Sequence, residues 1–252
     1  MLTVDLNADL GESYGNYTIG NDDEIIPLIS SANVACGFHA SDPSVMQKTV
    51  EMIRENGSTG IGAHPAYPDL MGFGRRYMEL SMPEVRSLIF YQLGALDGFC
   101  RVAGIEMNHV KPHGALYNAT FEDKELAKTI ADAVKDYNPK LKLMGLSNQN
   151  LVKAGEEAGL EVRHEVFADR AYEDDGTLVS RRKEGAMITD TSLAVERVIR
   201  MVREGKVEST GGRDIDIRAD SICVHGDGEK ALEFVKEIRK QLSENGIEIK
   251  TM

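Results

Sequence analysis

The 252-residue sequence is poor in cysteine, and it has no apolar run long enough to span a membrane. Its three cysteines, Cys36, Cys100 and Cys223, are far apart and form no C-x-x-C motif, which is typical of a reducing compartment rather than of a disulfide framework. The first five residues contain neither a cationic leader nor an apolar signal core. We therefore expect a cytoplasmic protein that does not interact with membranes.

Excess positive charge is also absent. Lys and Arg number 29 against 41 Asp and Glu, so the formal net charge is −12. An acidic surface repels nucleic acids and anionic membranes, and no basic stripe in the sequence offsets that repulsion. We therefore exclude these two classes of partner and expect the function to lie in a pocket that binds a small molecule.

The two common nucleotide-binding loops are missing as well. The sequence contains no G-x-x-x-x-G-K-[S/T] motif and no G-x-G-x-x-G motif. Any nucleotide that this chain uses must therefore be bound in an uncommon way or by another protein.

The sequence alternates short apolar runs, typical of buried strands, with longer amphipathic stretches, typical of helices. Asp42-Pro43 and the capping box Ser81–Glu84 each predict the start of a helix. Strand and helix in repeated order predict parallel strands joined by helical crossovers. The expected strands are 2–7, 32–36, 58–63, a short one around 110, 141–146, 160–167 and 221–224, with a final edge strand at 247–250. The expected helices are 22–30, 43–56, 81–104, 123–136, 149–158, 190–204 and 229–245.

No linker, repeat or low-complexity tract divides the chain. We therefore predict a single α/β domain over residues 1–252, a (β/α) barrel, with an open doubly wound sheet as the alternative. Two segments, 67–80 and 169–188, lack a regular pattern and are rich in glycine and charge. We expect them to be loops that cover a site.

Polar residues gather where the expected strands end. In parallel α/β proteins these ends meet at one rim, where functional sites form. Four of the six histidines follow different strands at equivalent positions, so we expect a shared pocket, although any one of them could simply close its strand through hydrogen bonds. These histidines are His39, His64, His113 and His225. The other polar residues near the strand ends include Asn7, Asp9, Glu12, Lys111, Tyr117, Asn118, Glu165, Asp169 and Arg170.

Imidazoles and carboxylates in one pocket suit either metal binding or proton transfer near neutral pH. In the metal interpretation, Asp9, His39 and His64 hold a divalent ion and leave a position for water. No H-E-x-x-H or comparable spacing supports this interpretation. We expect His109 and His164, which precede the strand ends, to have packing or supporting roles.

In the acid–base interpretation, a carboxylate and a histidine act on a carbonyl group. Two cations near the strand ends, Lys111 and Arg170, have two interpretations each. Either cation stabilises an oxyanion or a phosphate, or it pairs with a neighbouring carboxylate. The candidate acids and bases are Asp9, Glu12, His113 and His225.

Together, these clusters resemble the LamB/YcsF family. The resemblance covers essentially the whole chain, and one departure is Ser41, where the family usually has glycine. The segments that carry it are VDLNADLGE at 4–12, SANVACGFHA at 31–40, GAHP at 62–65, GFGRR at 72–76, HVKPHGALYN at 109–118, FADR at 167–170 and ICVHGD at 222–227.

The resemblance implies a seven-stranded (β/α) barrel related to the glycoside hydrolase/deacetylase superfamily. It also implies the ATP-dependent opening of 5-oxo-L-proline to L-glutamate, carried out together with the B and C subunits of a 5-oxoprolinase. Because the chain has no nucleotide motif, we expect ATP to be bound at least partly through those partners.

For that reaction we expect a base, a proton donor and cations that stabilise negative charge. Asp9 or Glu12 is the expected base, and His113 or His225 is the expected donor. Lys111 is expected to stabilise the anion. The expected substrate contacts are Asn7, His39, His64, Tyr117, Asn118, Asp169 and Arg170, of which Arg170 also stabilises the anion.

Two other functions stay open. One is a free-standing, metal-dependent deacetylase or amidohydrolase that acts on a small amide or sugar. It requires a divalent ion near Asp9, His39 and His64, and activity that a chelator abolishes. The other is a non-catalytic, substrate-binding subunit that offers a surface to B and C. The sequence also leaves a homo-oligomer open.

Overall fold

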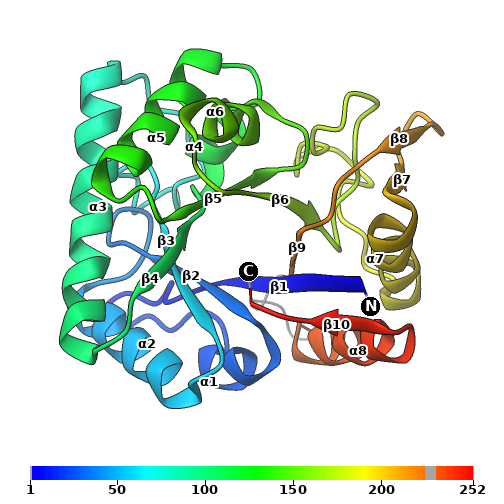
Figure 1. Cartoon of the computed structure of the whole chain (residues 1–252), viewed down its shortest axis with the longest axis horizontal. Coiled ribbons are helices and arrows are strands. Elements are labelled where there is room, and N and C mark those ends of the chain that lie inside the picture. Colours follow the sequence, from blue (N-terminus) through cyan, green and yellow to red (C-terminus); the bar gives the residue numbers. More distant parts are fainter. Residues whose placement is uncertain (1, 225–230, 252) are drawn as a thin grey trace.

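The structure, a computed structural model, describes residues 2–224 and 231–251. Seven parallel strands close into a barrel, and helices surround it (Figure 1). The strands are hydrogen-bonded in the order β1-β2-β3-β4-β5-β6-β9, and β9 pairs again with β1. This closure confirms the predicted barrel and excludes the open sheet. The seven strands are β1 (Leu2–Leu10), β2 (Ser31–Ala35), β3 (Gly60–His64), β4 (Met107–Val110), β5 (Lys142–Leu146), β6 (Val162–Phe167) and β9 (Ser221–Cys223).

The helices lie close to their predicted positions, and the predicted caps are present. Asp42 accepts hydrogen bonds from the backbone of Ser44 and Val45, and Ser81 forms a capping box with Glu84. No helix in the described part of the chain is long and apolar enough to cross a bilayer. The helices are α1 (Asp22–Ile25), the 3-10 helix η1 (Ile26–Leu28), α2 (Pro43–Asn56), α3 (Met82–Ala103), α4 (Gly114–Ala119), α5 (Lys124–Tyr137), α6 (Asn150–Ala158), α7 (Thr191–Glu204) and α8 (Ala231–Glu244).

Three short elements complete the fold. The predicted edge strand is present as β10 (Ile247–Ile249), and it pairs with the start of β1. The hairpin of β7 (Lys206–Glu208) and β8 (Asp214–Asp216) was not predicted, because each strand has only three residues and lies on the surface. Helix α4 was not predicted either, since its six residues fall within a segment whose polar residues indicated a strand end.

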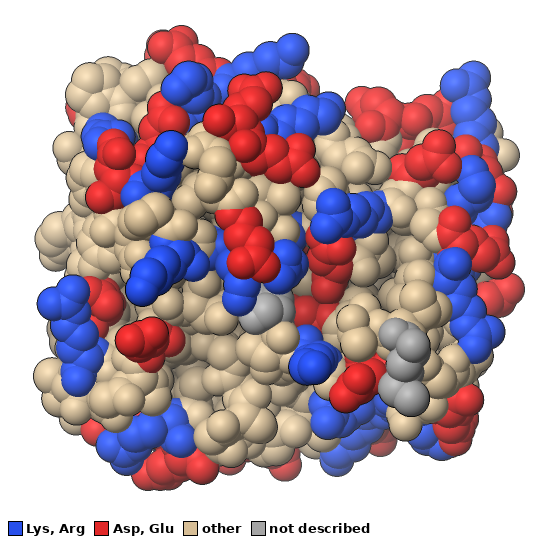
Figure 2. Space-filling view, viewed as in Figure 1, with Lys and Arg blue, Asp and Glu red and all other residues tan. Residues whose placement is uncertain are grey.

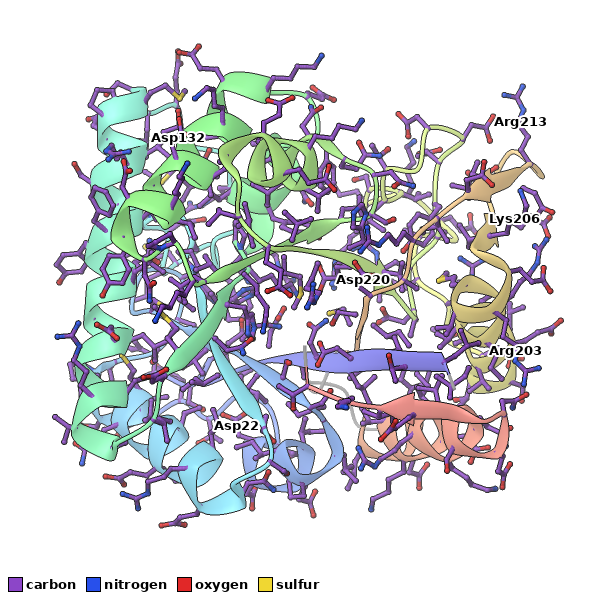
Figure 3. All side chains as sticks on the ribbon, viewed as in Figure 1. Asp22, Asp132, Arg203, Lys206, Arg213 and Asp220 are labelled. Carbon is purple, nitrogen blue, oxygen red and sulfur yellow. The ribbon has the colours of Figure 1, made fainter. Side chains whose placement is uncertain are left out.

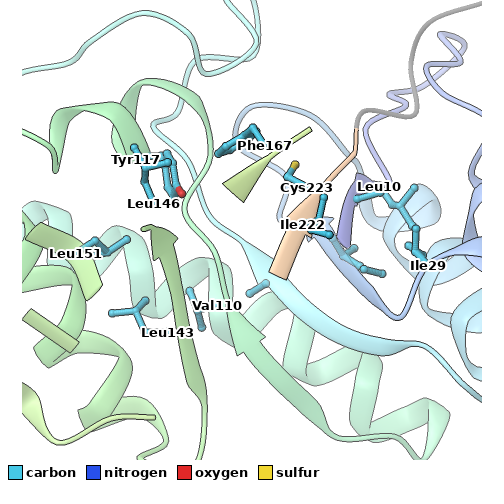
Figure 4. Packing of buried hydrophobic residues seen from close by; sticks show 14 of the residues in the cluster. Leu10, Ile29, Val110, Tyr117, Leu143, Leu146, Leu151, Phe167, Ile222 and Cys223 are labelled. Carbon is cyan, nitrogen blue, oxygen red and sulfur yellow. The ribbon is translucent and has the colours of Figure 1, made fainter. Parts of the chain in front are cut away.

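The barrel has an apolar outer layer and a polar interior. Side chains on the outer face of the strands pack under the helices, and Val110 on β4 pairs with Leu143 on β5 in this layer (Figure 4). Inside the barrel, Asp5 accepts hydrogen bonds from the hydroxyl groups of Ser30, Ser31 and Ser221. Polar residues that alternate along β1 and β2 therefore point inward. Pairing of Asn7–Leu10 with Ser31–Val34 extends β1 to Leu10, beyond its predicted end.

The outer surface carries both signs of charge. Asp132, Arg203, Lys206 and Arg213 project from the helices and from the hairpin (Figure 3). Lys and Arg are interspersed with Asp and Glu over the face shown in Figure 2. Neither sign of charge therefore forms a continuous stripe on this face.

Candidate active site

A cavity of about 750 Å³ opens where the barrel strands end. Its wall contains side chains that lie at or follow the ends of β1, β3, β4 and β6. Both long loops expected to cover a site contribute to it, one through Phe73 and Arg75 and the other through residues between 175 and 182. The predicted site residues in this wall are Asp9, Glu12, His64, Lys111, His113, Tyr117, Asn118 and Arg170.

Three other predicted site residues, His39, Asn7 and Asp169, are described and do not line the cavity. The ring of His39 stacks on that of His113, with 3.8 Å between their centroids. Asn7 is buried inside the barrel, where its Nδ2 donates to Ser221 Oγ. Asp169 is buried directly after β6. His225 lies outside the described residues, so its predicted role stays a prediction.

Asp9 has close polar neighbours at both of its carboxylate oxygens. Its Oδ1 accepts from Asn33 Nδ2 at 2.9 Å and from Lys111 Nζ at 2.9 Å, and its Oδ2 lies 3.2 Å from His64 Nε2. Burial alone would raise the pKa of Asp9, but His64 and Lys111 outweigh it and hold that pKa well below its usual range. Asp9 is therefore an ionised carboxylate at neutral pH.

Lys111 is a buried cation between two carboxylates. Its Nζ lies 2.9 Å from Asp9 Oδ1 and 2.7 Å from Glu165 Oε1. Burial acts to lower the pKa of Lys111, but Asp9, Cys223 and Glu165 raise it well above its usual value. Glu165 also accepts a hydrogen bond from the hydroxyl of Tyr117 at 2.7 Å. Lys111 therefore pairs with carboxylates, which is one of its two predicted roles.

Two histidines at the cavity have their tautomers set by backbone carbonyls. His64 Nδ1 lies 2.7 Å from the carbonyl oxygen of Lys111, and His113 Nε2 lies 2.9 Å from that of Phe73. A carbonyl oxygen only accepts, so each of these nitrogens carries a proton. When both rings are neutral, the remaining nitrogens, His64 Nε2 and His113 Nδ1, therefore present lone pairs to each other across 2.9 Å.

The surroundings of His64 Nε2 consist of acceptors. Besides His113 Nδ1 it faces Asp9 Oδ2, and facing lone pairs repel one another. Either a further proton on one ring or a cation between the groups removes this repulsion. Burial, together with His39 and His64, lowers the pKa of His113 well below its usual value, which disfavours the proton on that ring.

Four of these groups converge closely enough to hold a metal ion. Glu12 Oε1 lies 3.0 Å from His39 Nε2 and 3.7 Å from His113 Nδ1. One ligand atom from each of Glu12, His39, His64 and His113 lies within 4.8 Å of the others. Nitrogen and carboxylate donors of this kind suit Zn²⁺ and similar ions. We call these four residues the His–Glu cluster. It contains two of the three predicted metal ligands, and the third, Asp9, contacts it through His64.

A glycine allows the loop over the cavity to approach the cluster. Gly74 has φ +64°, and a Cβ there would lie 2.8 Å from His39 Cβ and from His113 Cδ2. Ser41, where the sequence differs from the family's usual glycine, also has positive φ, at +73°.

Sequence reasoning gave no role to several residues that build the site. Asn33 Nδ2 orients Asp9, and Asn33 Oδ1 faces His109 Nε2 at 2.8 Å, which agrees with the supporting role expected of that histidine. A polar residue within the otherwise apolar strand 32–36 was the available signal for Asn33. Glu165, inside an apolar strand, offered a similar signal. Phe73 acts through its backbone, which no side-chain pattern reveals.

Proteins similar to this chain are known over its full length. The chain is 57% identical to the protein of Clostridium beijerinckii that is named as the A subunit of 5-oxoprolinase, over 99% of this chain and 97% of that one. It shares 45% identity and a TM-score of 0.94 with the crystal structure of the lactam utilization protein from Thermus thermophilus, covering both chains completely.

A more distant likeness concerns the fold alone. The structure of T48 deacetylase with substrate superposes with a TM-score of 0.50 at 15% identity, over 99% of this chain and 88% of that one. This likeness agrees with the predicted deacetylase-like barrel. The sequence matches the model of the LamB/YcsF family over residues 4–252. The chain therefore belongs to the LamB/YcsF family.

Proposed function

We propose that this chain is the A subunit of a 5-oxoprolinase and that it opens the ring of 5-oxo-L-proline to give L-glutamate. The observation that carries the proposal is the 57% identity, over nearly the full length of both chains, to a protein named for that role. The His–Glu cluster beside the cavity supports it, because ring opening needs groups that accept and donate protons.

The ring amide explains why ATP is required. A five-membered lactam is stabilised by resonance, and phosphorylation of its oxygen by ATP would make the carbonyl carbon open to attack by water. We propose that ATP is bound with the partner subunits B and C, since this chain has no common nucleotide-binding loop. This chain would then receive the activated lactam in a cavity that limits its contact with bulk water.

Among the candidate bases, the geometry favours Glu12 over Asp9. Asp9 already accepts hydrogen bonds from Asn33 and Lys111, and its pKa, held well below the usual range, makes it a weak base. Glu12 lines the cavity and lies within 3.7 Å of His113 Nδ1. We assign Glu12 as the base that takes a proton from the attacking water. The donor to the leaving nitrogen is His225, or His113 once it has received that proton from Glu12 at Nδ1.

The same cluster fits a divalent ion, because both described groups that His64 Nε2 faces, His113 Nδ1 and Asp9 Oδ2, are acceptors. Glu12, His39, His64 and His113 would hold the ion, which would supply Lewis-acid activation of water or of the carbonyl group. The carbonyl oxygen of Lys111 would orient His64 through Nδ1, as backbone carbonyls commonly do for metal-binding histidines.

The direct test is glutamate release from 5-oxo-L-proline with this chain, its B and C partners and ATP. We expect release only when all three subunits and ATP are present, and no ATP hydrolysis by this chain alone. ATP hydrolysis by the isolated chain would contradict the assignment of ATP to the partners. The absence of glutamate from the complete mixture would contradict the proposed reaction.

A second candidate function is supported by the acceptor-lined His64 and by the deacetylase-like fold: a metal-dependent hydrolase of small amides that acts without ATP or partners. It predicts that the isolated chain releases acetate from N-acetylated substrates and that EDTA abolishes this activity. A non-catalytic subunit instead predicts that the complex keeps full activity when His113 is replaced by Gln.

A further inference from the structure

The cavity contains more positive charge than lactam opening at the His–Glu cluster uses. Four arginines line it although the chain as a whole carries a net charge of −12. Arg75 comes from the loop after β3, and Arg170, Arg181 and Arg182 come from the segment after β6. Two loops far apart in the sequence therefore bring guanidinium groups to one hollow.

Arg170 is the best-defined of these cations. It is only 7% exposed, and its Nη2 donates to the carbonyl oxygen of Val179 at 2.6 Å. Its Nε has no hydrogen-bond partner among the described residues. A buried donor without a partner is unfavourable, so an acceptor at this position would stabilise the protein. Burial and the nearby Arg181 lower the pKa of Arg170 to about 10, which leaves it charged at neutral pH.

Most of the described carboxylates at the same cavity have contacts of their own. Asp9 and Glu12 belong to the groups around the histidines described above. Asp175 accepts from the backbone and the hydroxyl of Thr177, and so stabilises a turn in its own loop. Glu122 lies exposed in the wall. Asp169, which follows β6 directly, offsets part of the charge of Arg170.

We propose that Arg170 and Arg181, assisted by Arg75 and Arg182, form a subsite for a phosphoryl group. Guanidinium groups match phosphate oxygens with paired, charge-assisted hydrogen bonds. The cavity of about 750 Å³ is also larger than a five-membered lactam requires, since drug-sized ligands occupy roughly 300–1,000 Å³. The inference rests on the proposed function: the phosphoryl group is the one transferred from ATP to the lactam oxygen.

The same chemistry has a second source, the phosphates of a nucleotide. The test is therefore calorimetric titration of the isolated, metal-free chain with inorganic phosphate, ADP and 5-oxo-L-proline in separate runs. We expect saturable phosphate binding that weakens as salt is added. If ADP binds much more tightly than phosphate through the same arginines, the subsite serves a nucleotide. That result would overturn its assignment to the phosphoryl group on the lactam.

Single-residue variants test which arginines bind phosphate. Arg181→Gln and Arg182→Gln remove exposed charges and preserve the bond of Arg170 to Val179. We expect each to weaken phosphate binding about tenfold, since a hydrogen bond to a charged group contributes roughly 1.5–3 kcal/mol. Arg101→Gln makes the same charge change on α3, where the side chain is 79% exposed and pairs with Asp97. Equal phosphate affinity in Arg181→Gln and Arg101→Gln, or no saturable binding, would overturn the subsite.

Phosphate inhibition of the reconstituted complex of this chain with B and C tests this inference separately from the proposed function. Phosphate is a product of the ATP-coupled reaction, so it should inhibit glutamate release, and Arg181→Gln should raise its inhibition constant about tenfold. Normal turnover with unchanged phosphate inhibition in this variant would overturn the subsite alone. Phosphate binding without any glutamate release would overturn the proposed function alone.

Discussion

At the scale of single residues, Lys111 balances the charge inside the barrel. Its ammonium group lies between Asp9 and Glu165, and its side chain is 3% exposed. Removing one partner of a buried ion pair leaves an uncompensated charge in a medium that solvates it poorly. The lysine therefore has a structural role in addition to any contact with substrate.

Replacing Lys111 by Met tests this role. We expect the free energy of unfolding to fall by about 3–5 kcal/mol, because the variant leaves the buried Glu165 and the partly buried Asp9 without a cation. Urea denaturation measures the change. The matched control is Lys128→Met, at a 66% exposed lysine paired with Asp132 on α5, for which we expect about 0.5 kcal/mol or less. Equal losses in the two variants would contradict the role.

His109 makes stability depend on pH. Burial and the nearby Lys111 lower its pKa to about 3, so it stays neutral in the folded chain while an unfolded chain protonates it below about pH 6.5. The unfolded state therefore binds the extra proton, and stability falls as pH falls from about 6.5 towards 3, by about 1.4 kcal/mol per pH unit for this group.

Urea titrations between pH 7.5 and 4.5 measure that slope. The variant His109→Gln should show a slope smaller by about 1.4 kcal/mol per pH unit, whatever its stability at pH 7.5. Parallel curves for the two proteins would show that His109 titrates normally in the fold.

The sequence predicted the residue types of the site better than their arrangement. Histidines at four strand ends indicated a shared pocket, and the structure brings three of them, His39, His64 and His113, into contact. The tautomers depend on carbonyl oxygens from Phe73 and Lys111, which come near only after folding. No spacing in the sequence could therefore separate the metal interpretation from the acid–base one.

At the scale of elements, the loop between β3 and α3 lies close against the histidines at a single glycine, Gly74. The positive φ of Gly74 and the lack of a Cβ let its backbone pass His39 and His113. The same loop provides the carbonyl oxygen of Phe73 that orients His113. The loop is therefore part of the site and does more than cover it.

The variant Gly74→Ala should displace the ring of His113 and lower kcat/KM of the reconstituted complex by about tenfold or more, since small misplacements of catalytic groups are costly. Gly57→Ala is the control, because Gly57 also has positive φ, +72°, but a Cβ there meets nothing closer than 4.0 Å. The control should lose about 1 kcal/mol of stability and keep its activity. Full activity of Gly74→Ala would contradict the role of the loop.

Regular elements were predictable where the amphipathic pattern is long. Helices such as α3 and α5 follow from caps and apolar faces, and the observed ends differ from the predicted ones by about a residue. The six-residue α4 and the β7–β8 hairpin are too short to repeat a pattern. The first predicted helix divides into α1 and η1, because Pro27 cannot donate the backbone hydrogen bond that would continue α1.

At the scale of the whole molecule, the closed barrel joins strands from both ends of the chain into one rim. Glu12 and His39 follow β1 and β2, whereas His64 ends β3 and His113 precedes α4. A ligand that binds these four side chains therefore connects separate parts of the fold. Binding to the folded state alone must raise the stability of the entire barrel.

Zn²⁺ or Co²⁺ should accordingly bind the isolated chain at one ion per chain and raise its unfolding temperature. At a free ion concentration of 100 times Kd the gain is about 2.7 kcal/mol. Equilibrium dialysis gives the stoichiometry, and calorimetry gives the shift. His113→Gln should weaken binding, and His164→Gln, at a histidine outside the cluster, should not. No shift with either ion would contradict the metal interpretation and leave the acid–base one.

Glu12→Gln in the reconstituted complex decides whether the His–Glu cluster is the reaction centre, through the rate of ATP-dependent glutamate release. If the cluster is that centre, this isosteric change should lower kcat by about 10²–10⁴-fold, as expected for the loss of a general base. Glu157→Gln, at an exposed position on α6, should leave kcat unchanged. Equal rates for the two variants would show that the reaction takes place elsewhere.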